Sequence, residues 1–215
     1  MDSGAAVPTG DLCLATAQTM VEALSSPAIA RRWEESSALA GYTIGGLAAH
    51  TARSIRTILA YLDGPEPAGA PITPAEYFLN GLRDEDPIDS DLHRSIRRRA
   101  VEVAADGPAE LLEAARTELS ALTERLATTS DRTVEVFGGA AMLLSDYLVT
   151  RLVEMVVHLD DLAHSIGSDL PDPPGEAIDL TLATLFEMAV ARNGPYAMLR
   201  GLSRAERMAE FPKAF

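Results

Sequence analysis

The segment Arg151-Leu-Val-Glu-Met-Val-Val-His-Leu-Asp-Asp-Leu162 carries two stripes of side chains at helical spacing. At about 100° per residue, its leucines and Met155 fall on one side of a helix, and a polar stripe falls beside them. Glu154 and His158 belong to the polar stripe and stand four residues apart, so their side chains lie on one face about one turn apart. The segment therefore predicts a long amphipathic helix, from about Met142 to Ile166.

A second amphipathic helix is predicted over residues 43–62, and it carries His50 on a polar stripe of its own. If the two helices face each other, His50 meets Glu154 and His158. Two neutral imidazoles and one carboxylate make a three-ligand set that leaves one coordination position open, as catalytic zinc sites do. The same set also suits Fe²⁺, Ni²⁺ or Mn²⁺. The sequence therefore predicts one divalent-metal site.

Further polar side chains surround this predicted site. Asp161 lies one turn beyond His158 and could hold its ring or a bound water. Arg151, one turn before Glu154, could pair with an anionic substrate. The two other histidines, His93 and His164, are expected at the surface. A pocket in front of the metal is expected to be lined by Thr43, Ser54, Tyr61, Tyr147 and Arg151.

Apolar residues recur at helical spacing in other segments too, and Pro- and Gly-rich breakers separate these segments. The fold class is therefore all-α: a four-helix bundle with one long connection between its second and third helices, plus a C-terminal helix and a mixed tail from Tyr196. Residues 133–141 are β-branched and glycine-rich, and we expect an extended loop there rather than a paired strand. The further helices are expected over about residues 11–25, 73–82, 89–105, 109–127 and 175–192.

The chain is expected to form a single domain with three parts. Residues 1–10 are a flexible N-terminal tail, and residues 11–170 are the metal-binding bundle. Residues 171–215 are a C-terminal helix and tail that pack on the bundle.

The composition excludes several classes of protein. Of 215 residues, 47% are hydrophobic, which is enough for a core, and the net charge is −14. Nucleic-acid binding requires a basic surface and is not expected; the one basic cluster, Arg97–Arg99, is expected to be a solvated helix face. No apolar run approaches the ~20 residues that cross a bilayer, and the first residues lack the pattern of a signal peptide. With Cys13 as a lone buried thiol, we expect a cytoplasmic protein.

The motif Arg151-x-x-Glu154-x-x-x-His158-x-x-Asp161-Leu162, paired with Leu47-Ala48-Ala49-His50, resembles the mycothiol-dependent maleylpyruvate isomerase family of the DinB/YfiT-like metal-binding bundles. The resemblance covers most of residues 11–205, and the tail 199–204 is similar to that of actinobacterial members. It implies that the matching His, Glu and His bind a divalent metal, usually zinc, and that mycothiol coordinates at or near it. The isomerase itself has an additional C-terminal domain, whereas only a helix and a tail follow here.

The expected function is metal-dependent thiol chemistry, in which a metal-activated thiol attacks a small electrophile for S-transfer or isomerisation. Asp161 and Arg151 are the candidate catalytic residues. Two alternatives remain open: a non-catalytic bundle that binds a metal or small ligand, and a metal-hydroxide hydrolase in which Asp161 orients the water. The expected partners are a thiol and an electrophile, in a monomer or homodimer. The candidate residues for binding the thiol or the substrate are Ser54, Tyr61, Tyr147 and Arg151.

Overall fold

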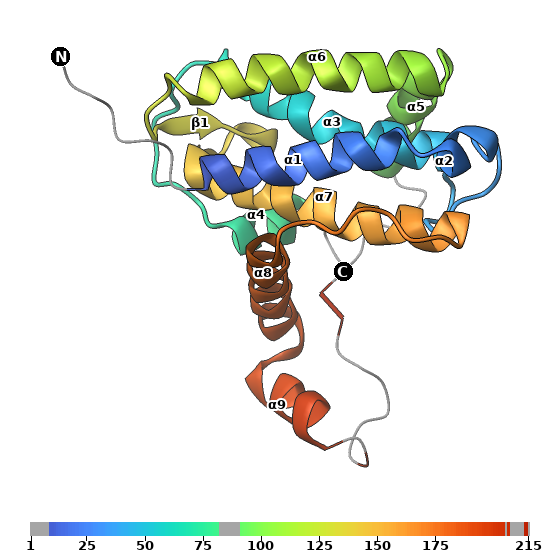
Figure 1. The fold of residues 1–215 in the computed structure, drawn as a ribbon. Helices are drawn as coiled ribbons and strands as arrows, with labels where there is room; N and C mark the ends of the chain where they lie inside the picture. The colour runs from blue at the N-terminus through green and yellow to red at the C-terminus, as the bar shows by residue number, and fades with distance from the viewer. Residues whose placement is uncertain (1–8, 82–90, 205, 207–212, 215) are drawn as a thin grey trace.

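The computed structural model describes residues 9–81, 91–204, 206 and 213–214, and most of the chain is helical (Figure 1). Each of the helices α1 and α3 contacts both α6 and α7, so that the four close into a bundle. The expected all-α four-helix bundle is thus confirmed. Its helices are α1 (Gly10–Leu24), α3 (Ile44–Leu62), α6 (Pro108–Leu126) and α7 (Leu144–Ile166).

The start of α3 is fixed by a cap and by a close contact. The Thr43 side chain accepts a hydrogen bond from the Gly46 backbone N–H at 3.0 Å, as an N-cap residue does. A Cβ atom at Gly45 would lie 2.4 Å from the Trp33 ring, so only glycine allows this approach. Trp33 follows the short helix α2 (Pro27–Arg31), and its indole N–H donates to the Ala104 carbonyl at 3.1 Å. The tryptophan therefore joins the start of α3 to the end of α5.

The long connection between α3 and α6 contains two helices, α4 (Pro74–Gly81) and α5 (Asp91–Ala104). Helix α5 packs on α3, whereas α4 packs on α7 and α8. Gly107 separates α5 from α6 with a φ of +96°, a conformation that favours glycine. The connection thus brings two additional helices to α3 and α7, beside the predicted metal ligands. The predicted start of α5 at residue 89 lies outside the described residues.

A short hairpin precedes α7. Strand β1 (Thr133–Glu135) pairs antiparallel with β2 (Ala141–Leu143), and the 3₁₀ turn η1 (Phe137–Gly139) joins them. The expectation of an unpaired loop here is therefore wrong. Two consecutive glycines with positive φ, Gly138 and Gly139, let the chain reverse within a few residues. Helix α7 consequently begins at Leu144 rather than at the predicted Met142, which belongs to β2.

Beyond the bundle the chain forms an arm, by which we mean helices α8 (Gly175–Asn193) and α9 (Pro195–Ser203). Helix α8 contacts α7, α4 and α1, and α9 contacts α8. In Figure 1 the arm projects from one side of the bundle. The segment from Tyr196, expected as a mixed tail, is thus helical as far as Ser203. Apart from residues 9 and 10, the expected N-terminal tail lies outside the described residues. None of the described helices combines the length and apolarity needed to cross a membrane.

Candidate metal centre and its pocket

The predicted metal ligands come together where α3 faces α7. The Nε2 atom of His50 lies 3.6 Å from the Glu154 Oε2 atom, and the Nε2 atom of His158 lies 3.3 Å from the same oxygen. The two imidazole centroids are 4.9 Å apart. One ligand atom from each residue fits within a span of 4.8 Å, and among the described residues this is the group able to hold a metal ion.

These separations fit a divalent metal. Ligand atoms at about 2.0–2.1 Å from a tetrahedral metal lie roughly 3.3 Å from one another. The observed 3.3 and 3.6 Å are close to that value, and both exceed the ~2.7–2.9 Å of a charge-assisted hydrogen bond. In addition, the buried Nδ1 atom of His50 has no hydrogen-bond partner in the described part of the chain. The donor set and its spacing therefore match a metal centre better than a closed hydrogen-bond network.

Asp161 orients one of the ligands from behind. Its Oδ2 atom lies 2.9 Å from His158 Nδ1, so the ring directs its other nitrogen, Nε2, toward Glu154. Metal-ligating histidines commonly have such a carboxylate partner. Burial lowers the pKa of His158, but the bonds to Asp161 and Glu154 outweigh it and raise the pKa to about 9. The bond to Nδ1 gives the Asp161 carboxylate a positioning role toward His158, and neither residue lines the pocket.

Glu154 is held as a carboxylate. Burial raises the pKa of Glu154, but the two imidazoles and the Arg151 guanidinium together lower it well below its usual range. An ionised carboxylate is the form that ligates a metal. The site thus presents an anionic ligand at neutral pH.

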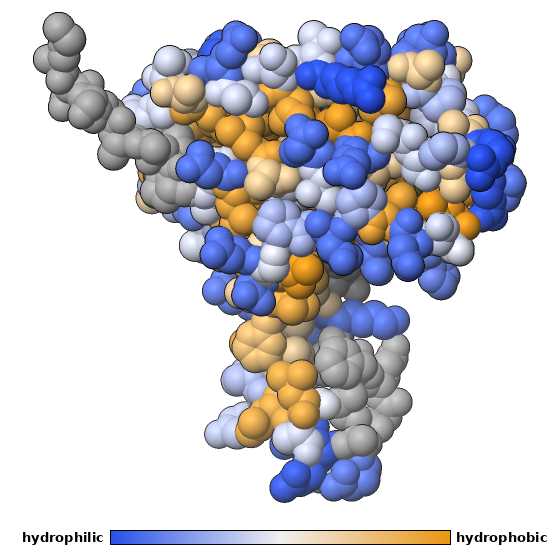
Figure 2. All heavy atoms as spheres, viewed as in Figure 1, coloured by the Kyte–Doolittle hydropathy of each residue, from blue (hydrophilic) through white to orange (hydrophobic). Residues whose placement is uncertain are grey.

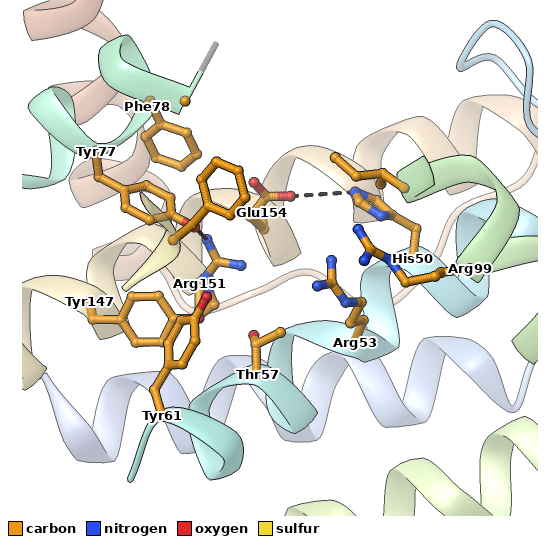
Figure 3. Close-up of a pocket in the computed structure, with 13 residues that line it drawn as sticks. His50, Arg53, Thr57, Tyr61, Tyr77, Phe78, Arg99, Tyr147, Arg151 and Glu154 are labelled. Atoms are coloured by element: carbon orange, nitrogen blue, oxygen red, sulfur yellow. Dashed lines mark hydrogen bonds and ion pairs between the residues drawn. The ribbon is translucent and has the colours of Figure 1, made fainter. Parts of the chain in front are cut away.

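His50 and Glu154, two of the three candidate ligands, line a pocket of about 140 Å³ (Figure 3). Its two ends differ in chemistry. One end is aromatic, and the other end lies beside His50 and Glu154 and is basic. The aromatic side chains are Tyr61, Tyr77, Phe78, Phe137 and Tyr147, and the basic ones are Arg53, Arg99 and Arg151.

Arg151 lies between the two ends and is almost fully buried. Its guanidinium stands over the rings of Tyr77 and Tyr147, at 5.5 and 4.9 Å from their centroids. It donates hydrogen bonds to the Thr150 hydroxyl at 3.1 Å and to the Tyr77 hydroxyl at 3.3 Å. The buried hydroxyl of Tyr147 lies beside the Thr57 hydroxyl, which also lines the pocket, but makes no hydrogen bond of ordinary geometry. Arg151 therefore holds the aromatic end in place, and the Tyr147 hydroxyl is available to a ligand.

A second cavity, of about 230 Å³, adjoins the pocket between α3, α5 and α6. It shares His50, Arg53, Ile96 and Arg99 with the first pocket, so these residues form a common wall. The basic end of the site thus continues into further space beneath α5.

Of the predicted pocket residues, Tyr61, Tyr147 and Arg151 line the pocket, whereas Ser54 and Thr43 do not. Ser54 lies about 40° from His50 on the α3 wheel, on the side that turns into the core, where it is buried. Thr43 is used as the N-cap of α3. The pocket instead follows the opposite side of the stripe.

The sequence analysis missed several of the residues that line the pocket. One of them, Arg53, could have been found, because it stands three residues after His50 and such a spacing places both on one helix face. Arg99 belongs to the cluster expected as a solvated face, and it is exposed, as its neighbour Arg98 is; unlike Arg98, it also lines the pocket. Arg98 pairs with Glu102 at 3.9 Å. The aromatic residues of α4 and η1, Tyr77, Phe78 and Phe137, had no local signal. His164 is exposed as expected, and the side chain of His93 lies outside the described residues.

Fold and site together define the class of protein: a helical bundle that can hold one metal ion on a His/Glu/His set at the inner end of a pocket. The family model of the mycothiol maleylpyruvate isomerase N-terminal domain matches residues 14–163. The chain therefore belongs to this family, as its motif indicated. No curated protein and no solved structure matches the chain. The arm lies beyond the matched residues.

Proposed function

We propose that this protein is a divalent-metal-dependent enzyme that uses a low-molecular-weight thiol, mycothiol by family membership. The enzyme either transfers the thiol sulfur to a small anionic electrophile or uses the thiol to isomerise that electrophile. One observation carries the proposal. The ligand atoms of His50, Glu154 and His158 converge, and His50 and Glu154 line a pocket that is rich in tyrosine at one end and in arginine at the other.

The thiol in this reaction has to come from outside the chain. Cys13 is the single cysteine, it is fully buried in the core, and burial raises its pKa to about 12. It therefore supplies no thiolate at physiological pH. When bound by His50, Glu154 and His158, a metal such as zinc would lower the pKa of an added thiol and stabilise its thiolate.

The aromatic end suits the polar body of such a thiol. The rings of Tyr61 and Tyr147 lie 4.9 Å apart, and those of Tyr77 and Tyr147 lie 6.2 Å apart. Their hydroxyls can donate hydrogen bonds, and that of Tyr147 makes no well-formed hydrogen bond within the described part of the protein, although Thr57 lies beside it. A buried hydroxyl without a partner is costly unless a ligand or water satisfies it. These contacts would fix the thiol with its sulfur toward the triad, which supplies the proximity that the reaction needs.

The basic end suits an acid group on the electrophile. The chain has a net charge of −14, yet three arginines line the pocket and Glu154 is the one carboxylate among its described lining residues. Arg53 and Arg99 extend toward the same space beside His50 (Figure 3). An arginine presents parallel N–H groups that match a carboxylate or phosphate. The electrophile would therefore be held with its acid group against α3 and α5.

The first test compares turnover of several electrophiles with mycothiol, glutathione, bacillithiol or no thiol. We expect thiol-dependent turnover that a chelator abolishes and zinc restores, together with thiolate-to-metal charge-transfer absorption in the cobalt-loaded protein. Equal turnover without thiol would favour the hydrolase. The absence of both turnover and absorption change on thiol addition would favour a non-catalytic binding module.

The second test separates the two ends of the pocket. Arg99→Ala should raise the KM for the electrophile, and Tyr147→Phe should raise the KM for the thiol, each with a smaller effect on the other substrate. Arg98→Ala is the matched control, because it removes the same charge from the neighbouring position on the exposed side of α5. If Arg98→Ala changes the KM for the electrophile as much as Arg99→Ala does, the assignment of the basic end is wrong.

A further inference from the structure

The arm exposes an apolar surface that the proposed reaction does not use. Helix α8 packs one side on the bundle and presents a second stripe to solvent at a spacing of four residues. Helix α9 continues this surface at a spacing of three. Figure 2 shows apolar side chains along the base and the middle of the arm, and hydrophilic side chains at its tip. The exposed fractions are 37% for Ile178, 59% for Leu182, 45% for Phe186, 70% for Tyr196, 59% for Leu199 and 62% for Leu202.

The size of this surface matches half of a dimer interface. The exposed fractions together equal a little over three whole side chains, or roughly 650 Å² at about 200 Å² for each. Monomeric proteins seldom leave more than a few hundred Å² of contiguous apolar surface exposed. A stable interface buries about 800 Å² on each partner, of which about two thirds is apolar in homodimers. The arm supplies that apolar area without any contribution from the bundle.

The charges along the arm favour a second copy of the same chain, packed in the opposite direction. Helix α8 carries the exposed acids Glu176, Asp179 and Glu187, whereas the exposed charge in α9 is Arg200. Arg204, directly after α9, is also exposed and pairs with the exposed Glu206 at 4.0 Å. A two-fold axis sets the same patch on both subunits against itself with the direction reversed. The acidic α8 of one copy then meets Arg200 of the other, which lowers the repulsion between two chains of net charge −14.

We infer that the protein forms a two-fold homodimer through the arm, with α8 of each subunit packed against α9 of its partner. The apolar stripe of the two helices forms the centre of this interface, and the acidic and basic side chains lie at its rim. The inference does not depend on the proposed reaction.

The test is the mass of the full chain in solution, measured by light scattering and by sedimentation at several concentrations. We expect a dimer of twice 22.9 kDa. Leu182→Glu and Leu199→Glu should each raise the dissociation constant at least ~30-fold, as loss of a central apolar contact does. Val101→Glu is the matched control, because Val101 is 55% exposed but belongs to α5. Circular dichroism shows whether each variant is folded.

Cross-linking tests the arrangement of the two arms. Leu182→Cys and Leu199→Cys place one thiol on α8 or on α9, and the native Cys13 is buried and does not compete. A mixture of the two variants, one with an affinity tag, should oxidise to the mixed 182–199 disulfide in preference to either symmetric one. Predominant symmetric disulfides would overturn the antiparallel arrangement. A monomeric native chain at 100 µM, or dimers that survive both glutamate variants, would overturn the interface itself.

Discussion

Asp161→Ala tests whether the carboxylate behind His158 controls the metal site. The 2.9 Å bond to Nδ1 sets the tautomer and the direction of Nε2, and no other partner of Nδ1 is described. Removal of such an outer carboxylate typically costs about 10–100-fold in metal affinity, or about 1.4–2.7 kcal/mol. In the metal-free native protein, His158 has a pKa of about 9, is protonated at pH 7 and also forms this bond. Asp161→Ala therefore destabilises the metal-free state as well, which offsets part of the loss in metal affinity. We therefore expect the lower part of the range at pH 7, about tenfold.

The chain offers a matched control for this variant at the adjacent position. Asp160 has the same charge and the same helix, but it is exposed and points away from the triad. Competition with a chromophoric chelator for zinc, at fixed pH and salt, measures both affinities. Asp160→Ala should change the affinity less than twofold. Equal losses in the two variants would mean that only the general negative charge of α7 matters, and an unchanged affinity in Asp161→Ala would refute the positioning role.

Three further outcomes are expected. Zinc affinity should rise about tenfold per pH unit from pH 7 until it levels near pH 9, because the proton on His158 competes with the metal below its pKa of about 9; levelling near pH 6.5 in the same chelator titration would contradict this. Cys13, whose pKa burial raises to about 12, should not react with a thiol reagent in the native protein and should give one equivalent after unfolding. Gly45→Ala should lower the free energy of unfolding by about 1–3 kcal/mol in urea titrations, because a Cβ would overlap the Trp33 ring, whereas Gly175→Ala, with open space around it, should not destabilise.

The sequence alone indicated the three residues that can hold a metal and the helices that carry them. The spacing of Glu154 and His158 places them on one helix face whatever the rest of the chain does, because helical geometry is local. Thr43 and Gly167 marked the ends of their helices for the same reason: a cap and a left-handed glycine act on adjacent backbone groups. Whether the polar stripe containing His50 faces the other one remained a condition in the sequence, and the packing of α3 on α7 fulfils it.

Only the tertiary structure decided the walls of the pocket, the hairpin and the arm. Arg99, Tyr77 and Phe137 reach the site from α5, α4 and η1, and their helical or turn periodicity contains no information on where the long connection places these elements. The hairpin depends on pairing between Val134 and Met142 across a turn, which the pattern of either strand alone does not show. In the sequence, the exposed apolar stripe of α8 cannot be distinguished from a stripe that packs in the core. The pattern of apolar residues is the same whether the face packs on its own bundle or on a second copy. Local geometry therefore determined the chemistry of the centre, and the packing of distant segments determined what can reach it.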